Sequence, residues 1–163
     1  MPKEAAGKTG VPTPTRNKPE RPRDRLGRPM AWGAQAELEL PDYDALSMDE
    51  NDRLGREAVA ARRWFPAHEV WETAWKQARG TGDEELFKGL SQMGAGYVHL
   101  LQGNAHGAIT LLRRAAGRVG AYPHGHRGIA TLVLRDKLLA DAALIERGVL
   151  VPAEDAAFPV PTV

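Results

Sequence analysis

The eleven residues from Phe65 to Trp75, FPAHEVWETAW, hold the densest group of chemically capable side chains in this chain. They combine one imidazole, that of His68, with the carboxylates of Glu69 and Glu72 and with two indoles. A histidine can transfer a proton or bind a metal ion near neutral pH, and a carboxylate can share either task. This segment is therefore where we expect any ligand-binding, metal-binding or catalytic function.

Helical geometry divides these side chains. At 100° per residue, His68 and Glu72 lie in line, four residues apart, on one edge of an apolar arc. Glu69 points about 100° away from His68, and we expect it to face solvent. The segment lacks the second histidine of the H-E-x-x-H zinc helix, so that motif does not explain it. The apolar arc comprises Ala67, Val70, Trp71, Ala74, Trp75 and Ala78.

A second group of polar residues lies on the helix predicted from about Asp83 to Gln102. This helix is apolar over most of its circumference, and its remaining face carries Gln92 and His99 beside Gly89 and Gly96. Glycine lowers helix stability, so two glycines seven residues apart indicate that another backbone approaches closely. If the helix that carries His68 lies on this face, then His68, Glu72, Gln92 and His99 converge.

The elements that must position these residues are all helical. Ser47 and Glu50 form a capping-box pattern that opens a first helix running to about Arg63. Pro66 suits the first turn of a second helix, which ends near Gly80 and Gly82. No stretch alternates with a period of two, so the chain predicts an all-α fold, a compact antiparallel bundle of about five helices. The two remaining helices are predicted from the N-cap Asn104 to about Ala121 and from about Gly128 to Arg147.

Composition divides the chain into four predicted segments: a flexible, proline-rich basic arm (1–29), a partly ordered connector (30–46), a helical domain (47–148) and an extended C-terminal tail (149–163). The arm holds eight Lys and Arg against three Asp and Glu, so it carries +5 and the remainder −4. It also holds six of the twelve prolines and few bulky apolar residues, which disfavours independent folding. Within and just after it, Leu26, Met30 and Trp32 are the residues able to dock onto the domain.

Overall composition excludes several classes of protein. A net charge of +1 argues against a dedicated nucleic-acid or membrane-surface protein, so neither partner is expected. The absence of cysteine excludes disulfides, thiol catalysis and cysteine-bound zinc. The N-terminus, MPKEAAGKTG, lacks the apolar core of a signal peptide, and no apolar run reaches membrane-spanning length. We therefore expect a soluble cytoplasmic protein.

Taken together, these blocks resemble the family known as domain of unknown function 309. Its F-x-A-H-E-x-x-E-x-x-W helix is matched from Phe65 to Trp75, including His68 and Glu72. The resemblance covers about residues 50–120 and implies a compact all-helical fold, but it supplies no activity. One departure is Gly94, where the family usually has alanine, which implies a mild packing change. The family's second helix is matched at Gly89, Leu90, Gln92 and His99, and its turn at Gly103, Asn104, Gly107 and Ala108.

Two hypotheses follow for function. In the first, His68, Glu72, Trp75, Gln92 and His99 form a site for a small polar ligand or a divalent metal ion. His68, Glu72 and His99 are then the candidate metal ligands, and His68 and Glu72 are the candidate catalytic residues. The residues leave open whether any reaction is catalysed.

In the second hypothesis the same cluster is a buried hydrogen-bond network that only specifies how the helices pack. The domain would then act as a module that forms a homo-oligomer or docks a protein partner. The surfaces available for such contacts are exposed tryptophans or an arginine face of the fourth helix, at Arg113, Arg114 and Arg118.

Overall fold

The computed structural model describes residues 20–163 as a bundle of five α-helices, which confirms the predicted all-α class. No strand occurs in this part of the chain, apart from an isolated bridge between Arg23 and Pro29. None of the helices in residues 20–163 is long and apolar enough to cross a bilayer. The helices are α1 (Met48–Ala60), α2 (Trp64–Gln77), α3 (Glu84–Leu101), α4 (Ala105–Val119) and α5 (Thr131–Glu146), with short 3-10 helices η1 (Tyr43–Ala45) and η2 (His126–Gly128).

The predicted helix starts at Ser47 and Asn104 are confirmed by their capping hydrogen bonds. The Ser47 hydroxyl accepts from the backbone N–H of Glu50, whose carboxylate accepts from the backbone N–H of Ser47. The Asn104 side-chain oxygen accepts from the N–H of Gly107 at 2.9 Å. Each bond satisfies an N–H group that the first helical turn leaves without an intrahelical partner.

The second helix ends at Gln77, three residues before the predicted Gly80, and two other helix ends differ from the prediction for reasons that backbone conformation explains. The first helix stops at Ala60 instead of Arg63, because Arg62 adopts a left-handed φ of +57° that redirects the chain into α2. The fifth helix begins at Thr131 instead of Gly128, because the turn before it holds Arg127 at a φ of +50°. A left-handed residue other than glycine costs conformational energy.

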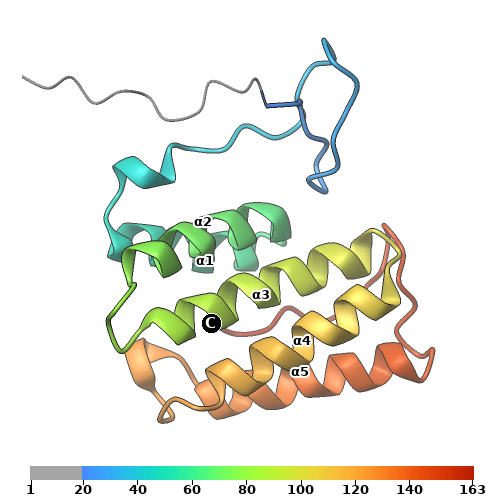
Figure 1. Cartoon of the computed structure of the whole chain (residues 1–163). Helices are drawn as coiled ribbons and strands as arrows, with labels where there is room; N and C mark the ends of the chain where they lie inside the picture. Colours follow the sequence, from blue (N-terminus) through green and yellow to red (C-terminus); the bar gives the residue numbers. More distant parts are fainter. Residues whose placement is uncertain (1–19) are drawn as a thin grey trace, which may run out of the picture.

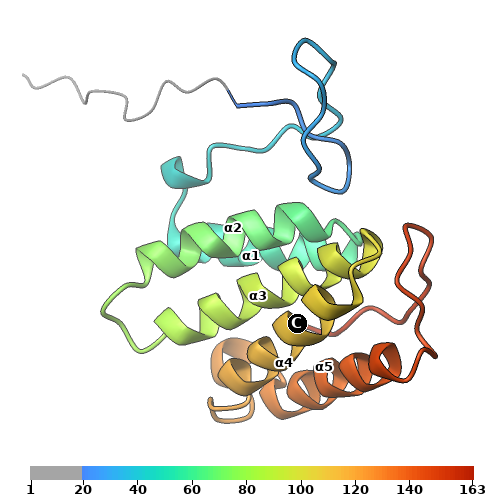
Figure 2. The same cartoon turned by 45° about the vertical axis from the view of Figure 1, so that its right-hand side comes forward.

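Each helix packs chiefly against its neighbours in sequence, so α3 lies between α2 and α4. Figures 1 and 2 show α1 and α2 as one layer, α3 beneath them, and α4 with α5 at the opposite side. The core runs through all of these contacts and includes the completely buried Trp71, Phe87 and Tyr97. The arrangement confirms the predicted bundle and makes α3 its central helix.

The glycines of α3 do mark close approaches, but to two different helices. A Cβ at Gly89 or Gly96 would meet Val119 or Leu112 of α4. Only Gly94 faces α2, where an added Cβ would lie 2.7 Å from the backbone nitrogen of His68. The face bearing Gly89 and Gly96 therefore packs against α4, and not against the helix that carries His68.

The described part of the N-terminal segment packs against the bundle. Leu26 is 5% exposed, and its carbonyl accepts from the Gln102 side chain at 3.2 Å. Gly27, with a φ of +79°, lies directly against the Phe65 ring. Trp32, by contrast, is 61% exposed and does not dock. Residues 1–19 of the predicted arm lie outside the described residues, and the four segment boundaries stay a prediction.

The C-terminal segment has no regular secondary structure but contributes to the core. The Phe158 ring stacks on Tyr97 with centroids 5.0 Å apart and an interplanar angle of 6°. Its carbonyl oxygen accepts a hydrogen bond from Arg62 at 2.9 Å. Four residues before Phe158, Glu154 pairs with Arg25, which ties the tail to the N-terminal segment.

Candidate functional site

His68 is held at the contact between α2 and α3 by Ser91. Its Nδ1 lies 3.1 Å from the Ser91 carbonyl oxygen and 3.0 Å from the Ser91 hydroxyl. That hydroxyl donates its hydrogen to the His68 carbonyl at 3.0 Å, and a carbonyl oxygen can only accept. Nδ1 must therefore carry the hydrogen, which leaves the lone pair of a neutral ring on Nε2.

The absence of a side chain at Gly94 permits this contact. A Cβ there would lie 2.7 Å from the His68 nitrogen and 2.9 Å from its Cα, distances that real Cβ atoms essentially never show. Because these are backbone atoms, α2 would have to move away. Glycine at 94 is thus more than the mild packing change that the resemblance implied.

The free nitrogen of His68 faces two carboxylates. Nε2 lies 3.7 Å from Glu69 Oε1 and 3.7 Å from Glu72 Oε2. One ligand atom from each of the three residues can be chosen so that all lie within 4.8 Å of one another. The three side chains are half-buried, with 27%, 35% and 34% of their surfaces exposed. We call these residues, His68, Glu69 and Glu72, the His68 cluster.

The electrostatics of this cluster favour an added positive charge. Burial raises the pKa of Glu69, and the neighbouring Glu72 raises it further, while His68 and Arg23 oppose them. Lys76 lies 3.4 Å from the other oxygen of Glu72, but its side chain is 58% exposed and such a pair is strongly screened. Within residues 20–163, no ion pair therefore joins Glu69 or Glu72 to a buried lysine or arginine.

Glu69 departs from the prediction that it faces solvent. It lines a cavity of about 290 Å³ together with residues between 20 and 40, among them Arg21 and Arg23. Helical geometry correctly turns Glu69 away from the core, but the N-terminal segment covers that side of α2. A pattern within one helix cannot reveal such a cover.

The structure does not bring the other predicted site residues into the same group. The Gln92 side-chain oxygen accepts from Arg118 Nε of α4 at 2.9 Å, so Gln92 faces α4. Trp75 is partly buried, with the ammonium of Lys88 4.9 Å from its ring centroid. Of the five predicted residues, only His68 and Glu72 have side chains that face one another at the cluster.

His99 is engaged by the N-cap of α4. Because the Asn104 oxygen accepts from Gly107, its nitrogen faces His99 Nδ1 at 3.0 Å and donates to it. The His99 hydrogen is then on Nε2. Burial lowers the pKa of His99, and the nearby His68 contributes in the same direction. In this arrangement the Asn104 amide occupies Nδ1, and the His99 nitrogen that remains for other contacts is Nε2.

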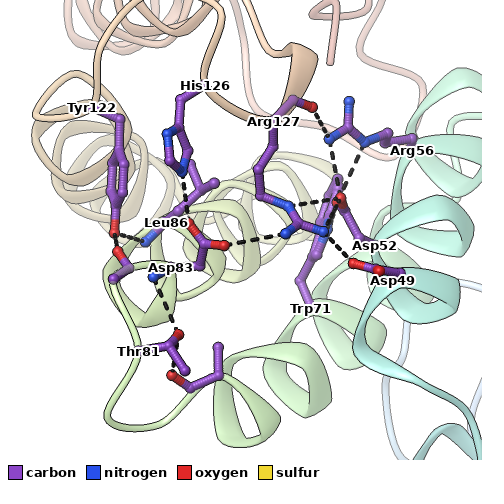
Figure 3. Close-up of polar contacts among 12 residues, drawn as sticks. Asp49, Asp52, Arg56, Trp71, Thr81, Asp83, Leu86, Tyr122, His126 and Arg127 are labelled. Atoms are coloured by element: carbon purple, nitrogen blue, oxygen red, sulfur yellow. Dashed lines mark hydrogen bonds and ion pairs between the residues drawn. The ribbon is translucent and has the colours of Figure 1, made fainter.

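A second polar cluster, which the sequence patterns did not predict, surrounds Arg127 (Figure 3). Its guanidinium lies 2.5 Å from Asp49, 3.1 Å from Asp83 and 3.5 Å from Asp52. His126 Nε2 donates to Asp83 at 2.6 Å. We call Asp49, Asp52, Asp83, His126 and Arg127 the Arg127 cluster, which joins α1, the start of α3 and η2.

Asp52 is the buried centre of this cluster. It accepts from the Trp71 indole at 3.1 Å and from two nitrogens of Arg56, at 3.0 and 3.3 Å. Arg127 Nε lies 3.5 Å from it but is buried without hydrogen-bond geometry. The one local signal for this network was Asp52 and Arg56, four residues apart on the first helix.

Part of the chain is similar to a known protein family. Residues 53–111 match the family model described as Domain of unknown function (DUF309). This match confirms the resemblance to the family for residues 53–111. The matched segment runs from α1 into α4, so it includes the whole His68 cluster, Gln92 and His99, while Arg127 and α5 lie beyond it. No curated protein and no solved structure matches the chain.

Proposed function

We propose that the DUF309 domain of this chain binds a divalent cation through His68, Glu69 and Glu72. The observation that carries the proposal is the orientation of His68, whose Nδ1–H is bonded to Ser91 while Nε2 faces the two carboxylates. In metal sites a ligating histidine is held in the same way, by a hydrogen bond from its other nitrogen to a carbonyl or carboxylate.

The spacing of the three groups suits coordination. Two ligands bound about 2.1 Å from a tetrahedral metal ion lie roughly 3.4 Å apart. The 3.7 Å separations between Nε2 and the carboxylate oxygens are within a few tenths of an ångström of that value. Small side-chain rotations would close the difference. All three residues lie on one helix, so its backbone need not move.

The ligand chemistry narrows the choice of cation. One imidazole nitrogen and two carboxylate oxygens suit Zn²⁺, Mn²⁺ or Fe²⁺ better than Ca²⁺, which prefers six or more oxygens. Three protein ligands leave coordination positions for water or a small polar ligand. Hydrolysis by a water bound there is the catalytic form of the proposal, with His68 and Glu72 holding the cation.

The other predicted residues take different parts in this proposal. His99 offers its Nε2–H as a donor to a bound polar ligand, and Trp75, three residues after Glu72 on the same helix, offers its ring. Gln92 is better explained by the hydrogen-bond network hypothesis, because its oxygen is already bonded to Arg118. The hydrogen-bond network hypothesis also explains the bond between His99 and Asn104.

Calorimetric titration of the full chain with Zn²⁺ and Mn²⁺ tests the proposal. We expect one cation per chain, and a loss of affinity of at least about tenfold in His68→Ala and in Glu72→Gln. His106→Ala and His124→Ala are matched controls, because both histidines are exposed and lie outside the cluster. No stoichiometric binding by the parent chain, or equal losses in the control variants, would overturn the proposal.

A further inference from the structure

The last helix, α5, carries apolar residues on its solvent side as well as on its core side. Seven large hydrophobic residues of the described chain are exposed, and five of them lie on α5 or within five residues of its end. Exposed apolar side chains grouped in this way, unlike scattered ones, indicate a contact surface. The five are Leu132, Val133, Leu139, Val149 and Val151.

The solvent side of α5 forms one continuous face. At 100° per residue its members fall within about 120° of the helix circumference, opposite the buried Leu134, Leu138 and Ile145. Figures 1 and 2 show α5 at the edge of the molecule, with α4 as the helix packed against it. The α5 face comprises Leu132, Val133, Asp136, Leu139, Ala140, Ala143 and Arg147.

The two charges on this face have opposite signs and point to the occupant. Asp136 and Arg147 are both exposed, and among the described residues Asp136 pairs with the adjacent, partly exposed Arg135. When two copies of α5 pack antiparallel about a two-fold axis near residues 141 and 142, Asp136 of each copy faces Arg147 of the other. The same register sets Ala140 against Ala143, and small residues at the centre let two helices approach closely.

We propose that the α5 face is the interface for a second copy of this chain, in an antiparallel two-fold dimer. A two-fold interface must be complementary to itself, and the charge order along α5 meets that condition. The proposal is independent of the cation site, which lies on α2.

The dimer should be concentration-dependent. A helix of 16 residues is about 24 Å long, so the face is small beside the 1,200–2,000 Å² that stable interfaces bury. We therefore expect a dissociation constant on the order of 10–100 µM, with the exchanged ion pairs deciding the register more than the affinity.

Sedimentation velocity of the full chain, in buffer with chelator and from about 1 µM to 1 mM, tests this interface. We expect the parent chain to dimerise, and Leu139→Glu, Asp136→Arg and Arg147→Asp each to weaken dimerisation at least about tenfold. Mixing Asp136→Arg with Arg147→Asp should restore the dimer, because both inter-copy pairs are then opposite in charge. Circular dichroism checks that each variant is folded.

Each possible result of the sedimentation experiment supports or overturns the proposed dimer. A parent chain that stays monomeric to about 1 mM overturns the proposal, as does a dimer that survives all three single substitutions. Failure of the two charge variants to associate with each other, when the parent chain dimerises, excludes the antiparallel register. A dimer that is weakened in each charge variant and restored when the two variants are mixed supports the proposed register. A nonspecific apolar contact would not produce this result.

Discussion

The His68 cluster and the Arg127 cluster both gather carboxylates at the surface of the same bundle, but they differ in the source of positive charge. In the Arg127 cluster one guanidinium contacts Asp49, Asp52 and Asp83, and Arg56 adds a second cation at Asp52. In the His68 cluster the group that faces Glu69 and Glu72 is an imidazole, with Nε2 3.7 Å from an oxygen of each.

This difference separates a structural network from a candidate site. A carboxylate loses hydration on burial, and a fixed arginine compensates only when the geometry is good. The Arg127 cluster meets this need with residues of the chain itself. In the His68 cluster the hydration that the carboxylates lose on burial is only partly compensated, which is the property expected of residues that bind a cation from solution.

Loss of the arginine should have the largest effect on stability. Arg127→Ala leaves Asp52 and its neighbours without their shared cation, and we expect it to lower the free energy of unfolding by about 3 kcal/mol. Urea denaturation at pH 7 measures this change. Arg53→Ala is the matched control, because Arg53 forms only an exposed pair with Glu57 and should cost less than about 1 kcal/mol.

A similar small loss for both arginine variants would contradict the structural role of the Arg127 cluster. Arg127→Lys adds a finer test, because lysine keeps the charge but cannot reach three carboxylates with a planar fork. We expect its stability to fall between those of the parent chain and Arg127→Ala.

The close approach at His68 gives the next largest effect. Gly94→Ala places a Cβ against the His68 backbone and should destabilise the fold by about 2 kcal/mol, because α2 must shift as a unit. Gly117→Ala is the matched control, since this helical glycine has nothing within 4 Å of an added Cβ. Alanine there should stabilise by roughly 0.5–1 kcal/mol.

Thermal or urea unfolding distinguishes the two glycine variants directly. If Gly94→Ala were as stable as Gly117→Ala, the helices would not be as close at this point as the structure places them. Cation binding by Gly94→Ala provides a second test. It should be weakened, because a shift of α2 would also move His68 away from Ser91.

Acid should weaken the Arg127 cluster through Asp83. Burial opposes ionisation of Asp83, but hydrogen bonds from His126 and Arg127 prevail and hold its pKa below the ordinary value. A depressed carboxyl pKa contributes stability that is present above the unfolded value, about 3.9, and is lost as pH falls through the folded value. The urea midpoint of the parent chain should therefore fall as the pH drops below about 4.

Asp83→Asn supplies the comparison for this titration. It should be less stable than the parent chain at pH 7, and the gap should narrow as the pH is lowered. A gap that stays constant down to about pH 2 would show that the Asp83 carboxylate is not stabilised in the fold.

The smallest predicted effect on stability comes from the His68 cluster. Unlike the others, it is a gain. Because the folded state raises the pKa of Glu69, its ionised form costs stability at neutral pH. In chelator, Glu69→Gln should therefore be neutral or more stable by less than about 1 kcal/mol, since the group is partly exposed. Melting temperatures measured with and without Zn²⁺ test this, with Glu57→Gln as an exposed control. A clear loss of stability in chelator would instead place Glu69 in a structural network.

Local sequence patterns predicted the helices well, for physical reasons. The caps at Ser47 and Asn104 depend on residues three apart, and the core face of α2 depends on a fixed helical period. Helix ends at Arg62 and Arg127 were missed, because arginine gives no local sign that it will adopt a positive φ.

The candidate site was predicted only in part, because side-chain partners depend on tertiary packing. The spacing of His68 and Glu72 follows from one helix and is present in the structure. The assignment of Gln92 to α4, the cover over Glu69 and the partners of Arg127 depend on segments far apart in sequence. Such contacts leave no periodic signal.

The long reach of Arg127 also bears on how the chain folds and unfolds. The helices pack on their sequence neighbours, which favours rapid folding, whereas Arg127 bonds to residues 44, 75 and 78 positions away. We expect such distant contacts to form late, after the helical hairpins are in place. Their loss should therefore speed unfolding and leave the refolding rate nearly unchanged. The Arg127 cluster would then set the lifetime of the folded molecule rather than the time it needs to fold.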